Sequence, residues 1–282
     1  METVIGLGEA GCNIAEVLSQ HPQYQIYRID SEKRQGKNFK LIKKQMSHQE
    51  YERNCPSMKS FLSNVKGHVL MITSGAGAIS GAILRVLEVL QHCKISILYI
   101  KPDIDVLSEK QRLRHRAGMG ILQEYARSAV FERIYIVDNL VMEDIIKDVP
   151  IVQYYDRLNE LIASTFNMIN VFKNSSSKID TFSDPVETAR ISTFGVFDME
   201  SGEEKLFYNL KMAREKCYYY AINKKQLASD GALLKSIKNQ IRSAKKTEDE
   251  KISVSYGIYE TEYDQNYVYV LSNASLVQEQ NL

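Results

Sequence analysis

The sequence predicts an α/β protein in which a parallel-sheet domain is joined by a long central helix to a smaller α+β C-terminal domain. Three observations support this fold class. Strands in the first half are apolar throughout and are each followed by a helical pattern; residues 151–171 form one long helical pattern; and the segments after it follow the order β-α-β-α-β-β. Strands without polar alternation are typical of parallel sheets covered by helices on both faces.

The first domain is assigned to residues 1–150. Its strands are expected at residues 4–7, 24–29, 69–73, 95–100 and 134–137, and its clearest helices at 13–18, 83–90 and 109–127. In an open parallel sheet, ligands bind beyond the carboxyl ends of the strands. The glycine-rich segments of this domain, together with Asp30 and Asn139, all follow such ends.

The central helix is assigned to residues 151–173 and the C-terminal part to residues 174–282. Strands are expected at residues 189–197, 217–222, 252–259 and 267–271, and helices at 203–214 and 227–245. This order predicts a small mixed sheet with helices on one face. The run Tyr218-Tyr219-Tyr220 is interpreted as a strand with both faces covered.

Composition and charge exclude several classes of protein. A net charge of +1 over 282 residues gives no global attraction to nucleic acid or membrane, and the chain carries no direct nucleic-acid signature. The four cysteines form no CxxC pair, which argues against a zinc site or a disulfide framework. No apolar run reaches the roughly 18–20 residues of a membrane span, and an immediate first strand leaves no room for a signal peptide. We therefore expect a cytoplasmic protein.

The first glycine motif is Gly6-Leu7-Gly8-Glu9-Ala10-Gly11, between a strand and a helix. Its glycines permit close backbone approach, and the helix N-terminus offers free N–H groups to an anion. Taken alone, the motif resembles a dinucleotide-binding fingerprint, with Asp30 placed to hold a ribose. The alternatives are a plain strand–helix turn for the motif and a helix cap for Asp30.

A second glycine cluster changes this interpretation, because it has no counterpart in the dinucleotide pattern. The segment Ile72-Thr73-Ser74-Gly75-Ala76-Gly77-Ala78-Ile79-Ser80-Gly81 resembles the signature loop I-T-A-G-M-G-G-G-T-G of the tubulin/FtsZ superfamily. The first motif, extended to Asn13, resembles that family's phosphate loop G-x-G-G-A-G-x-N. Further similarities occur in the family's order at Lys101-Pro102, at Ile136-Val137-Asp138-Asn139, in the central helix and at residues 179–184.

The resemblance implies GTP or GDP as ligand, with Mg²⁺ held through the phosphates and no protein metal site. Asp156 would accept hydrogen bonds from guanine, and Asn139 would contact base or ribose; the alternatives are a solvated helix residue and a strand-end cap. Arg112 falls near a sugar-and-phosphate position of the family, or else belongs to a solvated helix face. The implied phosphate-binding residues are Gly8, Glu9, Ala10, Gly11, Asn13, Ser74, Gly75, Gly77, Ala78, Ile79, Ser80 and Gly81.

The signature loop departs from the family pattern at Ala78 and Ile79, which replace glycines. A β-branched residue does not readily adopt positive φ. The loop can therefore keep the family geometry only if that geometry does not require positive φ at these two positions. Glu9 also replaces a glycine and places a carboxylate beside the expected phosphate.

The family's hydrolysis is completed across a polymer contact by an acidic loop, which the resemblance places at Asp180 and Asp184. It therefore implies a head-to-tail filament of a compact, phage- or plasmid-type relative that positions DNA or virions through an adaptor. A polar interdomain loop is the alternative for residues 179–184. Two other functions stay open: a degenerate, non-hydrolysing scaffold of the same fold, and a Rossmann oxidoreductase, which explains only the first motif.

Overall fold

The computed structural model describes residues 2–247 and 252–278. The chain divides into two compact units, one running to Ser164 and the other comprising Thr165–Gln278. The division falls within the long helix α6 (Ile151–Lys173), which begins in the first unit and ends in the second. Each unit is described by itself.

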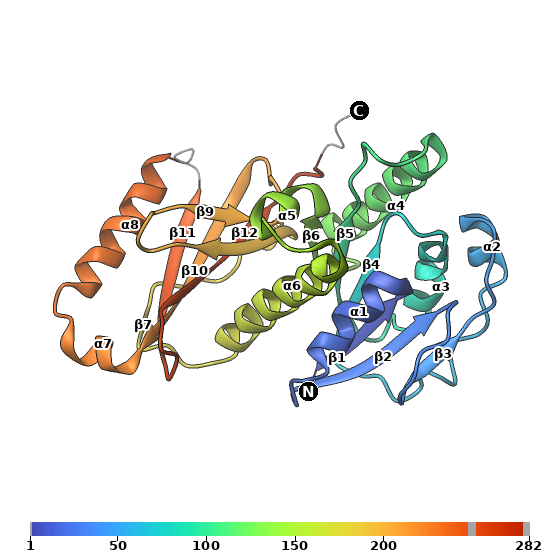
Figure 1. The fold of residues 1–282 in the computed structure, drawn as a ribbon, viewed down its shortest axis with the longest axis horizontal. Coiled ribbons are helices and arrows are strands. Elements are labelled where there is room, and N and C mark those ends of the chain that lie inside the picture. Colours follow the sequence, from blue (N-terminus) through green and yellow to red (C-terminus); the bar gives the residue numbers. More distant parts are fainter. Residues whose placement is uncertain (1, 248–251, 279–282) are drawn as a thin grey trace. The chain divides into compact units, whose positions relative to one another are not determined.

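The first unit is built on a parallel sheet in the order β3-β2-β1-β4-β5-β6 (Figure 1). Every neighbouring pair in this sheet is parallel, as the apolar strands predicted. The strand bounds are β1 (Glu2–Leu7), β2 (Tyr24–Asp30), β3 (Phe39–Leu41), β4 (His68–Ser74), β5 (Lys94–Lys101) and β6 (Arg133–Asp138).

Helices α1 and α5 of the first unit begin directly after strands β1 and β6. Asp138 caps α5 by accepting from the backbone N–H of Leu140, and Ser108 and Gln111 form a capping box at the start of α4. The bounds are α1 (Gly8–Leu18), α2 (His48–Arg53), the short 3-10 helix η1 (Ala78–Ala82), α3 (Ile83–Glu88), α4 (Glu109–Arg127) and α5 (Asn139–Ile146). None of the described helices is long and apolar enough to cross a membrane.

The strand order reverses direction between β1 and β4. The chain moves from β1 to β2 and β3 on one side, and then returns to place β4 on the other side of β1. Ligands of open α/β sheets bind at such a switch point, beyond the carboxyl ends of the two strands. Both glycine clusters begin there, because they follow β1 and β4.

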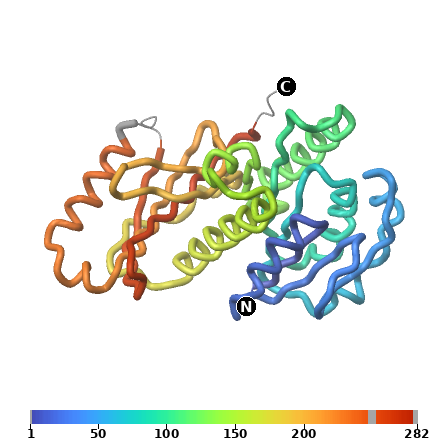
Figure 2. The backbone as a smooth tube through the Cα atoms, in the orientation of Figure 1, coloured from blue at the N-terminus to red at the C-terminus, as the bar shows by residue number. Residues whose placement is uncertain are grey.

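Helix α1 packs closely against β1, β2 and β4 (Figure 2). A Cβ added to Gly6 would lie 2.4 Å from the carbonyl oxygen of Gly11, and one added to Gly11 would lie 2.4 Å from the carbonyl oxygen of Ile72. The backbone atoms cannot move far enough to relieve contacts as short as these. Two of the three glycines of the first motif are therefore required for helix–sheet packing.

The second unit contains a mixed sheet in the order β8-β12-β10-β11-β7, with β9 beside β8. Only the β10–β11 pair is parallel. The bounds are β7 (Ile179–Asp180), β8 (Ile191–Phe197), β9 (Glu204–Leu206), β10 (Ala213–Asn223), α7 (Lys224–Ser229), α8 (Leu233–Thr247), β11 (Ser253–Thr261) and β12 (Tyr267–Ala274).

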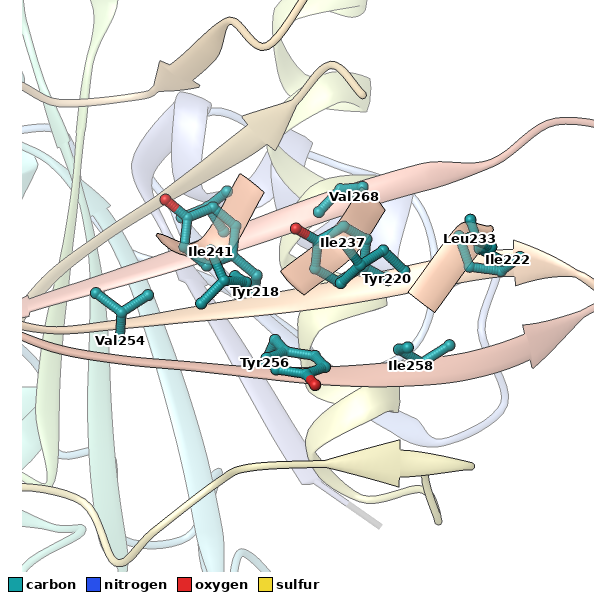
Figure 3. Packing of buried hydrophobic residues seen from close by; sticks show 11 residues of the cluster. Tyr218, Tyr220, Ile222, Leu233, Ile237, Ile241, Val254, Tyr256, Ile258 and Val268 are labelled. Atoms are coloured by element: carbon teal, nitrogen blue, oxygen red, sulfur yellow. The ribbon is translucent and has the colours of Figure 1, made fainter. Parts of the chain in front are cut away.

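Helix α8 covers one face of this sheet. Its Leu233, Ile237 and Ile241 point toward apolar side chains of β10, β11 and β12, among them Tyr218 and Tyr220 (Figure 3). Tyr219 points the other way, and its ring packs at 5.3 Å from that of Phe182. The tyrosine run is thus a strand with both faces covered, as predicted, and α6 also contributes through Phe172, packed on Tyr259 at 4.5 Å. The expectation of helices on one face only was too narrow.

The predicted helix at residues 203–214 is wrong. Residues 204–206 form β9, which pairs antiparallel with β8 through Gly195–Phe197. The intervening turn is fixed by the Asp198 carboxylate, which accepts from the backbone N–H groups of Glu200 and Ser201, and by Gly202 at φ +74°. Pairing with β8 and the turn at residues 198–202 therefore outweigh the local helix propensity of this segment.

The packing of α1 predicts opposite effects for two helical glycines. Gly11→Ala is expected to lower the free energy of unfolding by about 1–3 kcal/mol, because its Cβ meets fixed backbone. The matched control is Gly120→Ala in α4, where a Cβ meets no atom within 4 Å, and it is expected to raise stability by about 1 kcal/mol. Urea denaturation of both variants tests this, and equal effects would contradict the packing argument.

The contact between α4 and β5 predicts a pH dependence. The buried His115 shares a 2.8 Å hydrogen bond with the hydroxyl of Tyr99, and burial, with help from Lys101 and Arg116, lowers the pKa of His115 to about 4. The unfolded chain binds a proton near pH 6.5, whereas the folded chain does not. The contribution of His115 to the free energy of unfolding is therefore fully present above pH 6.5. It falls by up to about 3 kcal/mol as the pH decreases toward 4.

His115→Phe keeps a ring in the same place and removes the titration. Unfolding free energies measured between pH 4 and 7 should fall less steeply in this variant than in the wild-type protein. Parallel curves for the two proteins would mean that the pKa of His115 is the same in the folded and the unfolded chain.

Candidate functional site

The candidate site lies at the β1/β4 switch point of the first unit. It is formed by the start of α1 after β1 and by the segment from Ser74 to η1 after β4. Strands β1 and β4 are direct neighbours, with Leu7 opposite Thr73. The two glycine clusters, 66 positions apart in the sequence, are thus brought side by side, as predicted from their positions at strand ends.

The start of α1 offers backbone donors. Its N-cap, Leu7, supplies no side-chain hydrogen bond, and Gly8 adopts φ +74°, a conformation that favours glycine. The first N–H groups of a helix have no partner within it and carry positive partial charge, so they attract anions. The Glu9 side chain in this turn is exposed. Cys12 is buried, and burial raises the pKa of its thiol to about 12, which removes it as a nucleophile.

Arg34 closes one side of the first loop. Its guanidinium donates to Asp30 Oδ2 at 2.8 Å, to Asn13 Oδ1 at 2.7 Å and to the backbone oxygen of Glu9 at 3.4 Å. Asp30 is buried at the end of β2, whereas Arg34 is partly exposed. Two residues predicted to contact the nucleotide, Asp30 and Asn13, are therefore both bound to this cation.

The second loop is formed without any positive φ in its described residues. Gly77 is extended at φ −72° and ψ 140°, and Ala78, Ile79, Ser80 and Gly81 belong to η1. Alanine and isoleucine at positions 78 and 79 are accordingly compatible with this backbone. The Ser80 hydroxyl donates to the backbone oxygen of Gly77 at 2.7 Å, which ties η1 to its own start.

Two glycines of this loop are required by neighbouring elements. A Cβ at Gly75 would lie 2.1 Å from the Tyr99 hydroxyl, and one at Gly81 would lie 2.1 Å from the backbone oxygen of His48 in α2. The loop is therefore fitted to α2 and to the Tyr99–His115 pair. Packing against these neighbours therefore accounts for Gly75 and Gly81 without reference to a ligand.

Ile79 lies between the two loops. Its Cγ2 atom would be 2.7 Å from a Cβ placed on Gly8. The family pattern has glycine here, so this side chain occupies space above the start of α1 that a smaller residue would leave open. The Ile79 side chain therefore lies against the start of α1.

The ends of β5 and β6 form a second polar group. Lys101 and Asp138 are both buried and make an ion pair at 2.6 Å. The next residue, Asn139, carries a buried side-chain oxygen with no hydrogen-bond partner among the described residues. A buried unpaired acceptor costs free energy unless a ligand or water meets it, which makes Asn139 a candidate contact for either.

The first turns of α6 combine an orphaned hydroxyl with exposed apolar side chains. The Tyr154 hydroxyl is buried without a partner among the described residues, and its ring contacts that of Tyr155 at 5.3 Å. Ile151 and Val152 are 92% and 91% exposed. Asp156 is exposed on the same helix.

Three other predicted residues are Arg112, Asp180 and Asp184. Arg112 donates to the backbone oxygens of Leu107 and Asp105, and so holds the segment before its own helix. Asp180 belongs to β7 of the second unit, where it accepts from the Ser177 hydroxyl, and Asp184 is exposed in the same unit. Their proposed roles stay predictions.

Sequence reasoning did not single out Arg34, which lies in a basic stretch at residues 33–44. The available signal was the acidic residue Asp30, which lies only four residues earlier in the chain. Among the described residues, no group of three or more His, Cys, Asp or Glu side chains is placed to hold a metal ion.

Comparisons with known proteins were made for the family, the sequence and the fold. No protein-family model and no curated protein matches the chain. Solved structures match over almost its whole length. FtsZ from M. jannaschii is 11% identical with a TM-score of 0.70, covering 97% of this chain and 88% of FtsZ.

Two further structures are similar. A GTPγS-form protofilament of TubZ from Bacillus thuringiensis serovar israelensis is 15% identical with a TM-score of 0.72, covering 96% of this chain and 86% of TubZ. GTPγS-bound CetZ2 from Haloferax volcanii is 15% identical with a TM-score of 0.70, covering 96% of this chain and 92% of CetZ2. The chain therefore has the fold of the tubulin/FtsZ superfamily, as the order of its motifs predicted.

Proposed function

We propose that this protein binds GTP and GDP at the β1/β4 switch point and assembles head to tail into a filament. The observation that carries the proposal is the pairing of two glycine loops there, one of which presents the uncapped N-terminus of α1 at Gly8. Such a helix end binds phosphate through backbone N–H groups. The TubZ and CetZ2 structures of the same fold hold a GTP analogue.

The surrounding residues fit a nucleotide in part. The phosphates would lie over Gly8–Gly11 and the start of η1, with Arg34 beside them and Mg²⁺ held through phosphate oxygens. Asn139, whose buried oxygen is unpaired, would accept from base or ribose, and the Tyr154 hydroxyl offers a second polar contact. Asp156 would recognise guanine, because a carboxylate accepts from both N–H groups on its edge.

Assembly would follow the fold. FtsZ is recorded as a dimer and TubZ in protofilaments and two-stranded filaments. A heterologous contact that does not close generates an open filament. Asp180 and Asp184 of one subunit would then act on the nucleotide of the next by orienting water, since phosphoryl transfer depends mainly on positioning and electrostatics. DNA or virions, positioned in the cytoplasm, are the cargo that the motif resemblance suggests.

A second candidate function is a scaffold that keeps the fold but does not hydrolyse GTP. Ile79 favours it, because its side chain lies against Gly8 where phosphate would pass. The Arg34 bonds to Asp30 and Asn13 favour it too, because both predicted ligands are already satisfied. The oxidoreductase alternative is opposed by the fold of the second unit.

The proposal predicts selective GTP binding. Purified protein should bind a fluorescent GTP analogue that unlabelled GTP displaces and ATP does not, with light scattering rising in the same sample. Asp156→Ala should weaken GTP binding about tenfold while leaving the unfolding transition unchanged. Binding of neither nucleotide would reject this function and leave the scaffold, whereas GTP binding without a rise in light scattering would retain the site and reject the filament.

Ile79 provides a matched pair of variants. Ile79→Ala removes the Cγ2 atom that faces Gly8, whereas Ile79→Val retains it. We expect Ile79→Ala to bind GTP several-fold more tightly than wild type, and Ile79→Val to match wild type, as measured by the same displacement assay. A loss of affinity in Ile79→Ala would mean that the side chain supports the loop and does not obstruct it.

A further inference from the structure

Helix α8 of the second unit carries a row of cations along one side. Lys235, Lys238, Arg242 and Lys245 follow one another at spacings of three, four and three residues, and all four are exposed. At 3.6 residues per turn these positions lie within about 80° of one another around the helix, and at 1.5 Å per residue they span about 15 Å along it. These four residues are called the cation row below.

The cation row is a local excess of one sign of charge. Helix α8 contains no Asp or Glu, although cationic and anionic residues are equally numerous over residues 165–278 as a whole. Among the residues that the structure describes, no carboxylate forms an ion pair with the row, and Arg242 donates instead to Asn239 Oδ1 at 3.0 Å. The acidic residues 248–250 lie outside the described part of the chain. Net charge averages over the whole chain and therefore concealed this row.

The other side of α8 is already occupied. Its Leu233, Ile237 and Ile241 are buried against strands β10, β11 and β12 (Figure 3). An amphipathic helix binds a membrane by burying its apolar face among the lipids. Because the sheet holds that face of α8, only the charged side is left for a partner, and it has nothing to insert into a bilayer.

The exposed side of α8 lacks the anchors that a protein partner needs. No large apolar or aromatic side chain of the described part of α8 is exposed, and the exposed residues beside the row are the short polar Ser236, Asn239 and Ser243. Protein interfaces are centred on aromatic and apolar anchors and are depleted in charge at their core. Single-stranded nucleic acid is held largely by stacking on aromatic rings. Neither partner fits this surface.

The phosphates of a double helix fit it better. Phosphate oxygens are contacted by Lys and Arg together with Ser and Asn side chains, which are the residue types exposed on α8. Recognition of double-stranded RNA extends over about 16 base pairs and two minor grooves. A row of about 15 Å covers less than half of one DNA turn of about 34 Å, so it reaches only a few phosphates of one backbone.

We propose that the cation row binds the phosphate backbone of double-stranded DNA without reading its sequence. Each cation that neutralises a phosphate releases a condensed counterion, which supplies the free energy of binding. The inference goes beyond the proposed function, because it needs neither a nucleotide nor a filament. It also differs from DNA positioning through an adaptor, because the chain itself makes the contact.

The test uses the full-length protein without GTP and a fluorescein-labelled DNA duplex of mixed sequence. Fluorescence anisotropy should show saturable binding at about 50 mM salt, with log K falling against log [salt] at a slope of about −3 to −4, as expected for four phosphate contacts. A second duplex of unrelated sequence should bind equally. No binding at this salt concentration, or a clear preference for one duplex, would overturn the proposal.

Three double variants locate the contact. Lys235→Gln with Lys238→Gln should weaken binding at least about tenfold at low salt and reduce the salt slope by about 2. Lys59→Gln with Lys66→Gln makes the same change of net charge at exposed positions of the first unit and should bind as wild type. Lys235→Arg with Lys238→Arg retains the charge and should also bind as wild type. Unchanged binding in the first variant, or an equal loss in the Lys59 and Lys66 control, would overturn the proposal.

Two other polyanions test the choice of partner. Poly-L-glutamate stands for an acidic protein, and vesicles containing phosphatidylserine stand for an anionic membrane. Wild type should bind the duplex more tightly than either, as measured by competition with the labelled DNA and by co-sedimentation with the vesicles. Tighter binding of poly-glutamate or of the vesicles would assign the cation row to that partner and overturn the proposal.

Discussion

The close approach of α1 to the sheet is the constraint on which the first unit depends. Gly6 and Gly11 permit it, because a Cβ on either would lie 2.4 Å from a backbone oxygen. This approach fixes the N-terminus of α1 beside the end of β4, at the point where the strand order reverses. The glycines that the family resemblance assigns to phosphate binding therefore serve packing, and the position of the uncapped start of α1 follows from that packing.

The contacts at the switch point bear on the proposed nucleotide binding. Ile79 contributes an apolar contact over Gly8, and Arg34 satisfies Asp30 and Asn13, so the two loops are held together by their own side chains. A nucleotide bound there, as proposed, would replace some of these contacts. Its affinity would then be the difference between what it gains from backbone donors and what the loops lose.

The fold and the order of its elements were predictable because the apolar strands, the glycine clusters and the long helix each have a local sequence pattern. These patterns follow one another along the chain in a characteristic order. The segment at 203–214 was not, since its helical pattern is overridden by Asp198, Gly202 and pairing with β8, which are contacts made outside it. For the site, both loops were found from the sequence. Arg34 was not, because a basic stretch gives no indication of which residue folds back onto Asp30.

The sequence by itself determined the parallel sheet, the two-unit order and the meeting of both glycine clusters at strand ends, because each follows from short-range patterns. Only the tertiary structure decided what fills the space between them. The position of Ile79 over Gly8 and the unpaired oxygen of Asn139 depend on packing among elements far apart in the chain. Packing of this kind cannot be recognised from the order of residues in the sequence.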